Sequence, residues 1–213
     1  MKKKKGFYAS LGLLAVFAMW TLLVCTVDVC PIGPNDSEVG FATLNGSVHD
    51  RIGVHMSVYT ITDWLGLVPI VIALGFGTLG LWQWMKRKSF LKVDRSIRML
   101  GAFYIAVIAV YAFFEVVVVN YRPVLIEDVL EVSYPSSTTT LAMCVMPTAM
   151  MQFADRIKHK ALRIGIGFVI VAFTAFMVIG RLVSGVHWLT DIVGGALLSA
   201  GLVTMYHWVA YEK

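Results

Sequence analysis

Residues 64–84 read WLGLVPIVIALGFGTLGLWQW and contain no charged side chain. A helix that crosses a bilayer needs roughly 20 mainly apolar residues, so this stretch is long enough to span a membrane. The same pattern recurs along the chain between short polar connections. We therefore expect six spanning helices, at residues 7–27, 64–84, 100–119, 136–153, 162–179 and 188–210.

The composition is that of a polytopic membrane protein. Hydrophobic residues make up 58% of the 213 positions and charged residues 15%, and the mean hydropathy of +0.76 exceeds that of ordinary soluble domains. A membrane-spanning β-barrel would alternate apolar and polar side chains, which GLLAVFAMW at residues 12–20 does not. We expect an all-α fold, with residues 1–213 in one transmembrane bundle and the first apolar run retained as a helix rather than cleaved as a signal peptide.

Basic residues predict the orientation of this bundle. If the N-terminus is cytoplasmic, all but three of the 18 Lys and Arg residues fall in cytoplasmic segments, and the outer side keeps only Arg51, Arg122 and Arg181. Cytoplasmic loops carry this excess in membrane proteins, so both termini are expected in the cytoplasm of a multi-pass protein of the cell membrane. The net charge of +5 lies at membrane edges, which argues against a nucleic-acid partner.

The last outer connection concentrates residues suited to phosphate chemistry. Arg181 is followed after five residues by His187 and after three more by Asp191. The spacing of His187 and Asp191 is one helical turn, so we expect both side chains on one face. The carboxylate would then fix the tautomer of the imidazole and increase its nucleophilicity, while Arg181 offers a planar fork of donors to phosphate oxygens. The alternative is an interfacial histidine paired with its aspartate, beside an arginine that reaches lipid headgroups.

The second outer connection adds further groups that suit an anion. Arg122 is followed by Pro123, which is expected to end the third helix. Ser136, Ser137 and Thr138 stand at the start of the fourth helix, where the free amides and the positive end of the helix dipole can bind phosphate. An ordinary helix cap explains these hydroxyl residues equally well. We predict that all of these groups bind the phosphate end of a lipid at the outer face.

With these motifs the sequence resembles the type 2 phosphatidic acid phosphatase family, integral membrane lipid phosphatases related to vanadium haloperoxidases. Its members carry a Lys separated by six residues from Arg-Pro, then Pro-Ser-x-His, then Ser-Arg, five residues, His, three residues and Asp. The resemblance implies that His187 is the nucleophile, that Asp191 orients it, and that Arg122 and Arg181 clamp the transition state. It also implies a phosphohistidine intermediate without cofactor or metal.

Two positions depart from the family pattern. Glu115 stands at the lysine position, and Thr138 replaces the histidine that protonates the leaving group. General acid catalysis typically contributes 10²–10⁴-fold, and a lipid alcohol is a poor leaving group without a proton. The departures favour a polyprenyl diphosphate as substrate, whose phosphate leaving group is less basic, or a catalytically silent protein that binds or transports lipid phosphates. We expect Glu115 to pair with an arginine, since an unpaired carboxylate near the bilayer is costly.

Two other histidines, His49 and His55, lie in the first outer loop and are candidates for a surrogate acid. Amphipathic stretches of this loop are expected to cover the site, and Asn45-Gly46-Ser47 fits a glycosylation acceptor. The predicted partners are a lipid phosphate or diphosphate substrate and membrane lipids. Whether the chain forms a homodimer is left open by the sequence.

Overall fold

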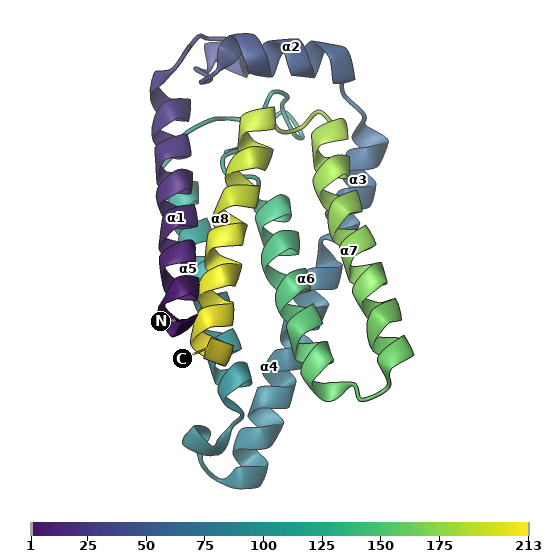
Figure 1. Cartoon of the computed structure of the whole chain (residues 1–213). Helices are drawn as coiled ribbons and strands as arrows, with labels where there is room; N and C mark the ends of the chain where they lie inside the picture. The colour runs from purple at the N-terminus through teal and green to yellow at the C-terminus, as the bar shows by residue number, and fades with distance from the viewer. Residues whose placement is uncertain (1, 213) are drawn as a thin grey trace.

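The computed structural model describes residues 2–212, with the side chains of 4–212, and this part of the chain folds into helices without a β-sheet (Figure 1). The elements in chain order are α1 (Lys2–Thr26), η1 (Pro34–Asp36), α2 (Ala42–Ile52), α3 (Met56–Leu65), α4 (Leu67–Arg87), η2 (Phe90–Lys92), α5 (Arg95–Val116), α6 (Ser137–Arg156), α7 (Lys160–Val183), α8 (Leu189–His207) and η3 (Trp208–Glu212). The all-α prediction is confirmed.

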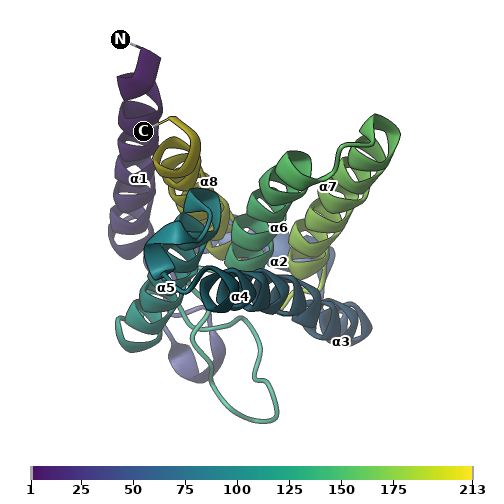
Figure 2. The same cartoon turned by 90° about the horizontal axis from the view of Figure 1, so that it is seen from below.

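Five segments of the described chain are long and apolar enough to cross a membrane, which makes this a multi-pass membrane protein. They are Lys4–Thr26, Met56–Arg87, Arg95–Val116, Lys160–Val183 and Leu189–Glu212. The fourth expected helix forms as α6, but its composition is less apolar than that of the other five. Seen along the bundle in Figure 2, α6 lies between α7 and α8, and it also packs on α4 and α5. Its polar residues are tolerated because protein, rather than lipid, surrounds most of it.

Helices α1 and α8 form the largest contact in the bundle, and both termini lie at the same end (Figure 1). The two helices approach closely because α8 carries glycine at the contact: a Cβ on Gly201 would lie 2.7 Å from a side-chain carbon of Leu14. Near the other end, Gly194 makes room for the buried ring of Tyr134, whose hydroxyl lies 2.7 Å from Thr21 Oγ1. This contact ties the residues just before α6 to both α1 and α8.

Helix α2 lies across the end of the bundle away from the termini (Figure 1), and the short helix α3 leads from it into α4. Most of both helices lies between the first two spans that the sequence predicted, in the loop whose stretches were expected to cover the site. Asn45 of α2 is fully buried, donates to the Gly40 carbonyl at 2.7 Å, and accepts from the backbone nitrogen of Thr190 at 3.2 Å. The glycosylation reading is therefore wrong, because this amide is a structural contact inside the protein.

The connection from α5 to α6 folds back on itself as a narrow hairpin. Tyr121 pairs with Val132 and Ile126 with Val129, and the turn between them has positive φ angles at Glu127 and Asp128, of 49° and 63°. Two consecutive residues with positive φ form the kind of β-turn whose twist matches that of the two paired segments of a hairpin. Helix α5 ends at Val116, so the expectations that it reaches residue 119 and is ended by Pro123 were wrong.

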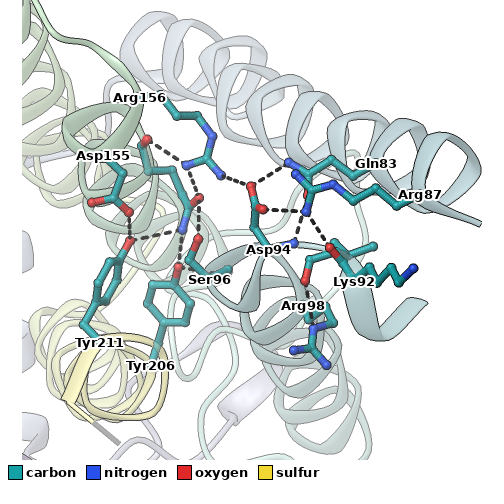
Figure 3. Close-up of polar contacts among 12 residues, drawn as sticks. Gln83, Arg87, Lys92, Asp94, Ser96, Arg98, Asp155, Arg156, Tyr206 and Tyr211 are labelled. Carbon is teal, nitrogen blue, oxygen red and sulfur yellow. Dashed lines mark hydrogen bonds and ion pairs between the residues drawn. The ribbon is translucent and has the colours of Figure 1, made fainter. Parts of the chain in front are cut away.

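A polar network joins the helices at the end that carries the termini (Figure 3). The Asp94 carboxylate accepts from Gln83 Nε2 at 2.7 Å and from Arg87 Nη1 at 2.8 Å, and Arg156 of α6 lies 3.8 Å away. The hydrogen bond from Arg87 is the main reason that the pKa of Asp94 lies below its usual value. These contacts hold α4, α5 and α6 together far from the predicted phosphate site.

Candidate active site

His187 and Asp191 lie at the start of α8, in a buried site at the end of the bundle under α2. His187 precedes the helix, and Trp188 is its N-cap residue. The Asp191 carboxylate, three positions further on, accepts from the Trp188 backbone nitrogen at 2.9 Å. His187 Nδ1 lies 3.9 Å from Asp191 Oδ2, too far for a hydrogen bond. The prediction that the two share a helical face was wrong, because the helix begins after His187.

The hydroxyl of Ser133 connects the two side chains instead. Its Oγ lies 2.9 Å from His187 Nδ1 and donates to Asp191 Oδ2 at 2.5 Å. The amide of Asn120 donates to the other carboxylate oxygen of Asp191 at 3.1 Å. Sequence reasoning missed both Ser133 and Asn120, since neither lies in a recognisable motif. The hairpin brings them together: the backbone nitrogen of Ser133 donates to the Asn120 carbonyl at 2.9 Å.

The second ring nitrogen of His187, Nε2, is buried and has no hydrogen-bond partner. Burial is the main cause that lowers the pKa of His187 to about 4, and the positive charges of Arg122 and Arg181 act in the same direction. The imidazole is therefore neutral at physiological pH. A neutral imidazole with an unpaired ring nitrogen is the form in which histidine acts as a nucleophile.

Arg181 and Arg122 approach His187 from two different segments. Arg181, near the end of α7, is 1% exposed and contacts α3 through Thr62 Oγ1 at 3.4 Å and Asp63 Oδ1 at 3.6 Å. Both guanidinium groups lie over the ring of Tyr59 in α3, at 4.9 Å for Arg181 and 5.9 Å for Arg122. Tyr59 was not predicted, because no sequence motif marks it. Both arginines lie close enough to His187 for their charges to lower its pKa, and their binding of phosphate stays a prediction.

Arg122 forms its ion pair inside the hairpin. Its Nε lies 2.9 Å from Glu131 Oε2, and its backbone nitrogen donates to the Glu131 carbonyl at 3.0 Å. The Glu115 side chain instead interacts with Tyr111, one turn earlier in α5. The expected pairing of Glu115 with an arginine is thus wrong, because α5 ends directly after Glu115 and the hairpin supplies a different carboxylate to Arg122.

The start of α6 also reaches the site. Ser136 caps the helix: its Oγ accepts from the Thr139 backbone nitrogen at 3.4 Å, and its own backbone nitrogen donates to the Asp191 carbonyl at 3.1 Å. The capping role expected for these hydroxyl residues is confirmed for Ser136. Ser137 and Thr138 instead line a neighbouring cavity. The hydroxyl groups of the three residues therefore do not converge on a single anion position.

The two candidate acids occupy different surroundings. The ring centroid of His49 in α2 lies 5.4 Å from that of Trp188, with the two ring planes tilted by 52°, and His49 Nε2 lies 3.1 Å from the Gly185 carbonyl oxygen. It lines a small void of about 10 Å³ together with His187. His55 is exposed, and its Nε2 lies 2.9 Å from the Ile52 carbonyl oxygen. Only His49 therefore belongs to the surroundings of His187.

A mainly apolar cavity of about 320 Å³ adjoins the site. Helices α4, α5, α6 and α8 and the hairpin contribute to its wall. Its polar lining includes Ser133, Glu115, Ser137 and Thr138, and most of the remaining wall consists of aliphatic and aromatic side chains. Because Ser133 also contacts His187, the cavity reaches the immediate neighbour of the histidine.

The buried polar atoms at the centre define what this site can bind. His187 Nε2, Arg122 Nη1 and Arg181 Nε have no hydrogen-bond partner. Two neighbouring guanidinium groups repel one another, and unpaired buried polar atoms are costly. A tetrahedral oxyanion would bring acceptor oxygens to the two arginines and an electrophilic phosphorus to the histidine. The arrangement suits a tetrahedral oxyanion such as phosphate, at one end of a membrane helix bundle.

Comparison with known proteins agrees with this class. The chain belongs to the PAP2 superfamily, which matches residues 102–213 and so includes Arg122, Arg181, His187 and Asp191. The crystal structure of a transmembrane PAP2-type phosphatidylglycerolphosphate phosphatase from Bacillus subtilis shares the fold, with a TM-score of 0.58 and 18% sequence identity over 93% of this chain and 94% of that chain. No curated protein matches the sequence.

Proposed function

We propose that this protein is a membrane lipid phosphatase that hydrolyses polyprenyl diphosphates through a phosphohistidine intermediate at the outer face of the membrane. The observation that carries the proposal is the group of three unpartnered buried atoms, His187 Nε2, Arg122 Nη1 and Arg181 Nε. They provide a nucleophile beside two phosphate ligands. Membership of the PAP2 superfamily supports phosphate chemistry on a lipid.

The proposed reaction has two steps. His187 Nε2 attacks the terminal phosphorus, the bond from that phosphorus to the bridging oxygen breaks, and the polyprenyl monophosphate leaves with the bonding electrons. Arg122 and Arg181 stabilise the charge on the phosphoryl oxygens as they spread in the transition state. Water then attacks the phosphohistidine, releases inorganic phosphate and restores the neutral imidazole.

The adjoining cavity supports a lipid substrate. Its wall is mainly apolar, and Ser133, which contacts His187, lies at its polar part. A lipid chain in this cavity would place its phosphate end near the two arginines. The volume of about 320 Å³ suits the first part of a chain, and the remainder would extend between the helices into the bilayer.

The outer location rests on the distribution of charge. The Lys and Arg residues concentrate at the end of the bundle that carries the termini, and the site lies at the other end. The positive-inside bias then directs the site outward. In this orientation α6 is the sixth span, since α5 and α7 on either side of it both cross the membrane and its 20 residues cover about 30 Å.

The preference for a diphosphate follows from the leaving group. Thr138 and Glu115 line the cavity beside the site, and Thr138 offers no imidazole to protonate an alkoxide. An unprotonated alkoxide is a far poorer leaving group than a phosphate. The missing acid is worth roughly 3–5 kcal/mol in the barrier, from the typical 10²–10⁴-fold contribution of general acid catalysis.

The deciding experiment compares two matched substrates on the purified protein in lipid nanodiscs. A polyprenyl diphosphate should be hydrolysed at least about 10²-fold faster than the monophosphate of the same chain length. His187→Ala should abolish turnover but retain substrate binding, and acid-labile phosphate should be trapped on the wild-type protein alone. Thr138→His should raise the monophosphate rate and narrow the gap.

The other outcomes of this experiment are also informative. Equal rates on both substrates would mean that another group, His49 or His55, supplies the proton, and replacing each by Gln would identify it. Binding of both lipids without turnover would refute the phosphatase proposal. The protein would then be a catalytically silent one that binds or transports lipid phosphates, which is the second candidate function because Thr138 stands in place of the catalytic acid.

A further inference from the structure

We propose that Ser133 is a positioning residue, whose hydroxyl transmits the orienting effect of Asp191 to His187 and fixes the tautomer of the imidazole. This inference rests on the proposed phosphohistidine mechanism. In the family pattern an aspartate orients the histidine, but here the two side chains are 3.9 Å apart at their nearest polar atoms. The Ser133 hydroxyl is hydrogen-bonded to both of these side chains.

The donor and acceptor roles follow from the partners. An ionised carboxylate only accepts hydrogen bonds, so the Ser133 hydroxyl must use its proton toward Asp191, at 2.5 Å. Its oxygen then has only lone pairs for His187 Nδ1, at 2.9 Å. Nδ1 must therefore carry the proton of the neutral ring. Nε2, the unpartnered nitrogen, keeps its lone pair for attack on phosphorus.

Asp191 is held in place for this role by its other hydrogen bonds. It is fully buried and accepts from the Trp188 backbone nitrogen at 2.9 Å and from Asn120 at 3.1 Å, in addition to Ser133. With three donors around it, the carboxylate cannot turn toward His187 without losing a hydrogen bond. The serine hydroxyl is therefore the part that couples the carboxylate to the ring.

The hairpin connects this coupling to the phosphate ligands. Ser133 is bonded through its backbone to Asn120, and the backbone of Arg122 is bonded to Glu131 across the same hairpin. Ser133 and Arg122 are both at most 7% exposed. A single short segment thus positions both the imidazole and one guanidinium group.

The test uses three variants of the full chain in nanodiscs. Ser133→Ala removes the hydroxyl, Ser133→Thr retains it, and Ser199→Ala is the control. Ser199 is also a fully buried hydroxyl, but it bonds to the Gly195 carbonyl within α8 at 2.7 Å and has no contact with His187. We expect Ser133→Ala to lower kcat by roughly 10²-fold with little change in KM, from the typical effect of losing a group that orients a histidine.

A second readout does not depend on turnover. In histidine-labelled protein, ¹⁵N NMR distinguishes the two neutral tautomers, and the signal of His187 is identified by its loss in His187→Ala. The wild type, Ser133→Thr and Ser199→Ala should carry the proton on Nδ1. Ser133→Ala should populate the Nε2-protonated form.

Two results would overturn the inference. One is an unchanged tautomer together with wild-type kcat in Ser133→Ala. The other is an equal loss of kcat in Ser133→Ala and Ser133→Thr with the tautomer unchanged, which would mark Ser133 as a packing residue only. If the wild type itself does not turn over any lipid phosphate, the phosphatase proposal fails, while the NMR measurement still decides whether Ser133 sets the tautomer.

Discussion

The pH dependence of the reaction is the sharpest consequence of the burial of His187. Its pKa is lowered to about 4, mainly by burial and further by the two arginine charges, against roughly 6.5 for an exposed histidine. At pH 5 a histidine with the ordinary pKa would keep only about 3% of its neutral form, whereas one with a pKa of 4 keeps about 91%. The expected rate at pH 5 therefore differs by about 30-fold between the two cases.

The assay is kcat/KM for a polyprenyl diphosphate from pH 3.5 to 8 at constant ionic strength, because kcat/KM reports the ionisation of the free enzyme. It should stay close to its plateau down to pH 5 and fall by half near pH 4. The titration of His187 followed by ¹⁵N NMR without substrate separates its pKa from the ionisation of the lipid. Arg122→Gln should move this titration to higher pH, since the Arg122 charge lowers the pKa.

Unfolding at low pH needs a control in this experiment. Because the pKa of His187 is lower in the fold than in the unfolded chain, the unfolded chain binds the proton first as the pH falls. The fold has the full stability contribution of this group above pH 6.5 and loses about 3 kcal/mol between pH 6.5 and 4. The melting temperature is therefore measured at each pH. A His187 titration near 6.5 in the intact protein, or only a few per cent of the activity at pH 5, would refute the reasoning.

Three further predictions concern other parts of the molecule. Asp191→Asn should lower kcat by about 10²–10⁴-fold, because the amide can donate to Ser133 and reverse the hydrogen bonds that set the tautomer; an unchanged kcat would contradict this. Gly185→Ala should destabilise the protein by at least about 2 kcal/mol in reversible unfolding, since Gly185 has a φ of +70° and a Cβ there would lie 2.1 Å from the Gly53 carbonyl oxygen. Asp94→Asn should lower the melting temperature without changing kcat, because Asp94 accepts a charged hydrogen bond far from the site; a matching loss of kcat would show coupling between the two ends.

The features of the fold and of the candidate site that the sequence predicted are those that depend on long apolar runs and on the spacing of motif residues. The apolar runs located the helices to within a few residues in most cases, and the spacing of Arg181, His187 and Asp191 indicated the candidate site. Most of the predictions that were wrong concern the exact positions at which helices begin and end. Asp191 is the third residue of α8, and its carboxylate accepts from the backbone nitrogen of the N-cap residue Trp188. His187 therefore lies before the helix, and the helical face inferred for it did not exist.

The residues that were missed come from segments without a periodic pattern. Ser133 and Asn120 meet only because Glu127 and Asp128 turn the hairpin, and a turn with two positive φ angles is normally indicated by Asn-Gly or Asp-Gly. Tyr59 belongs to a loop helix and reaches the arginines through the packing of α3 on α7. No local signal encodes such a contact between distant segments.

The position of α6 has a consequence for how the protein enters the membrane. Translocation machinery releases a helix into lipid according to its own hydropathy, and α6 is the one long helix among the described residues whose composition falls short. Its fully buried Thr139, Thr148 and Gln152 would meet lipid if it were released alone. We expect α6 to stay at the insertion site until α7 and α8 have been synthesised, so that the three helices enter the bilayer as a unit and the active site is assembled last.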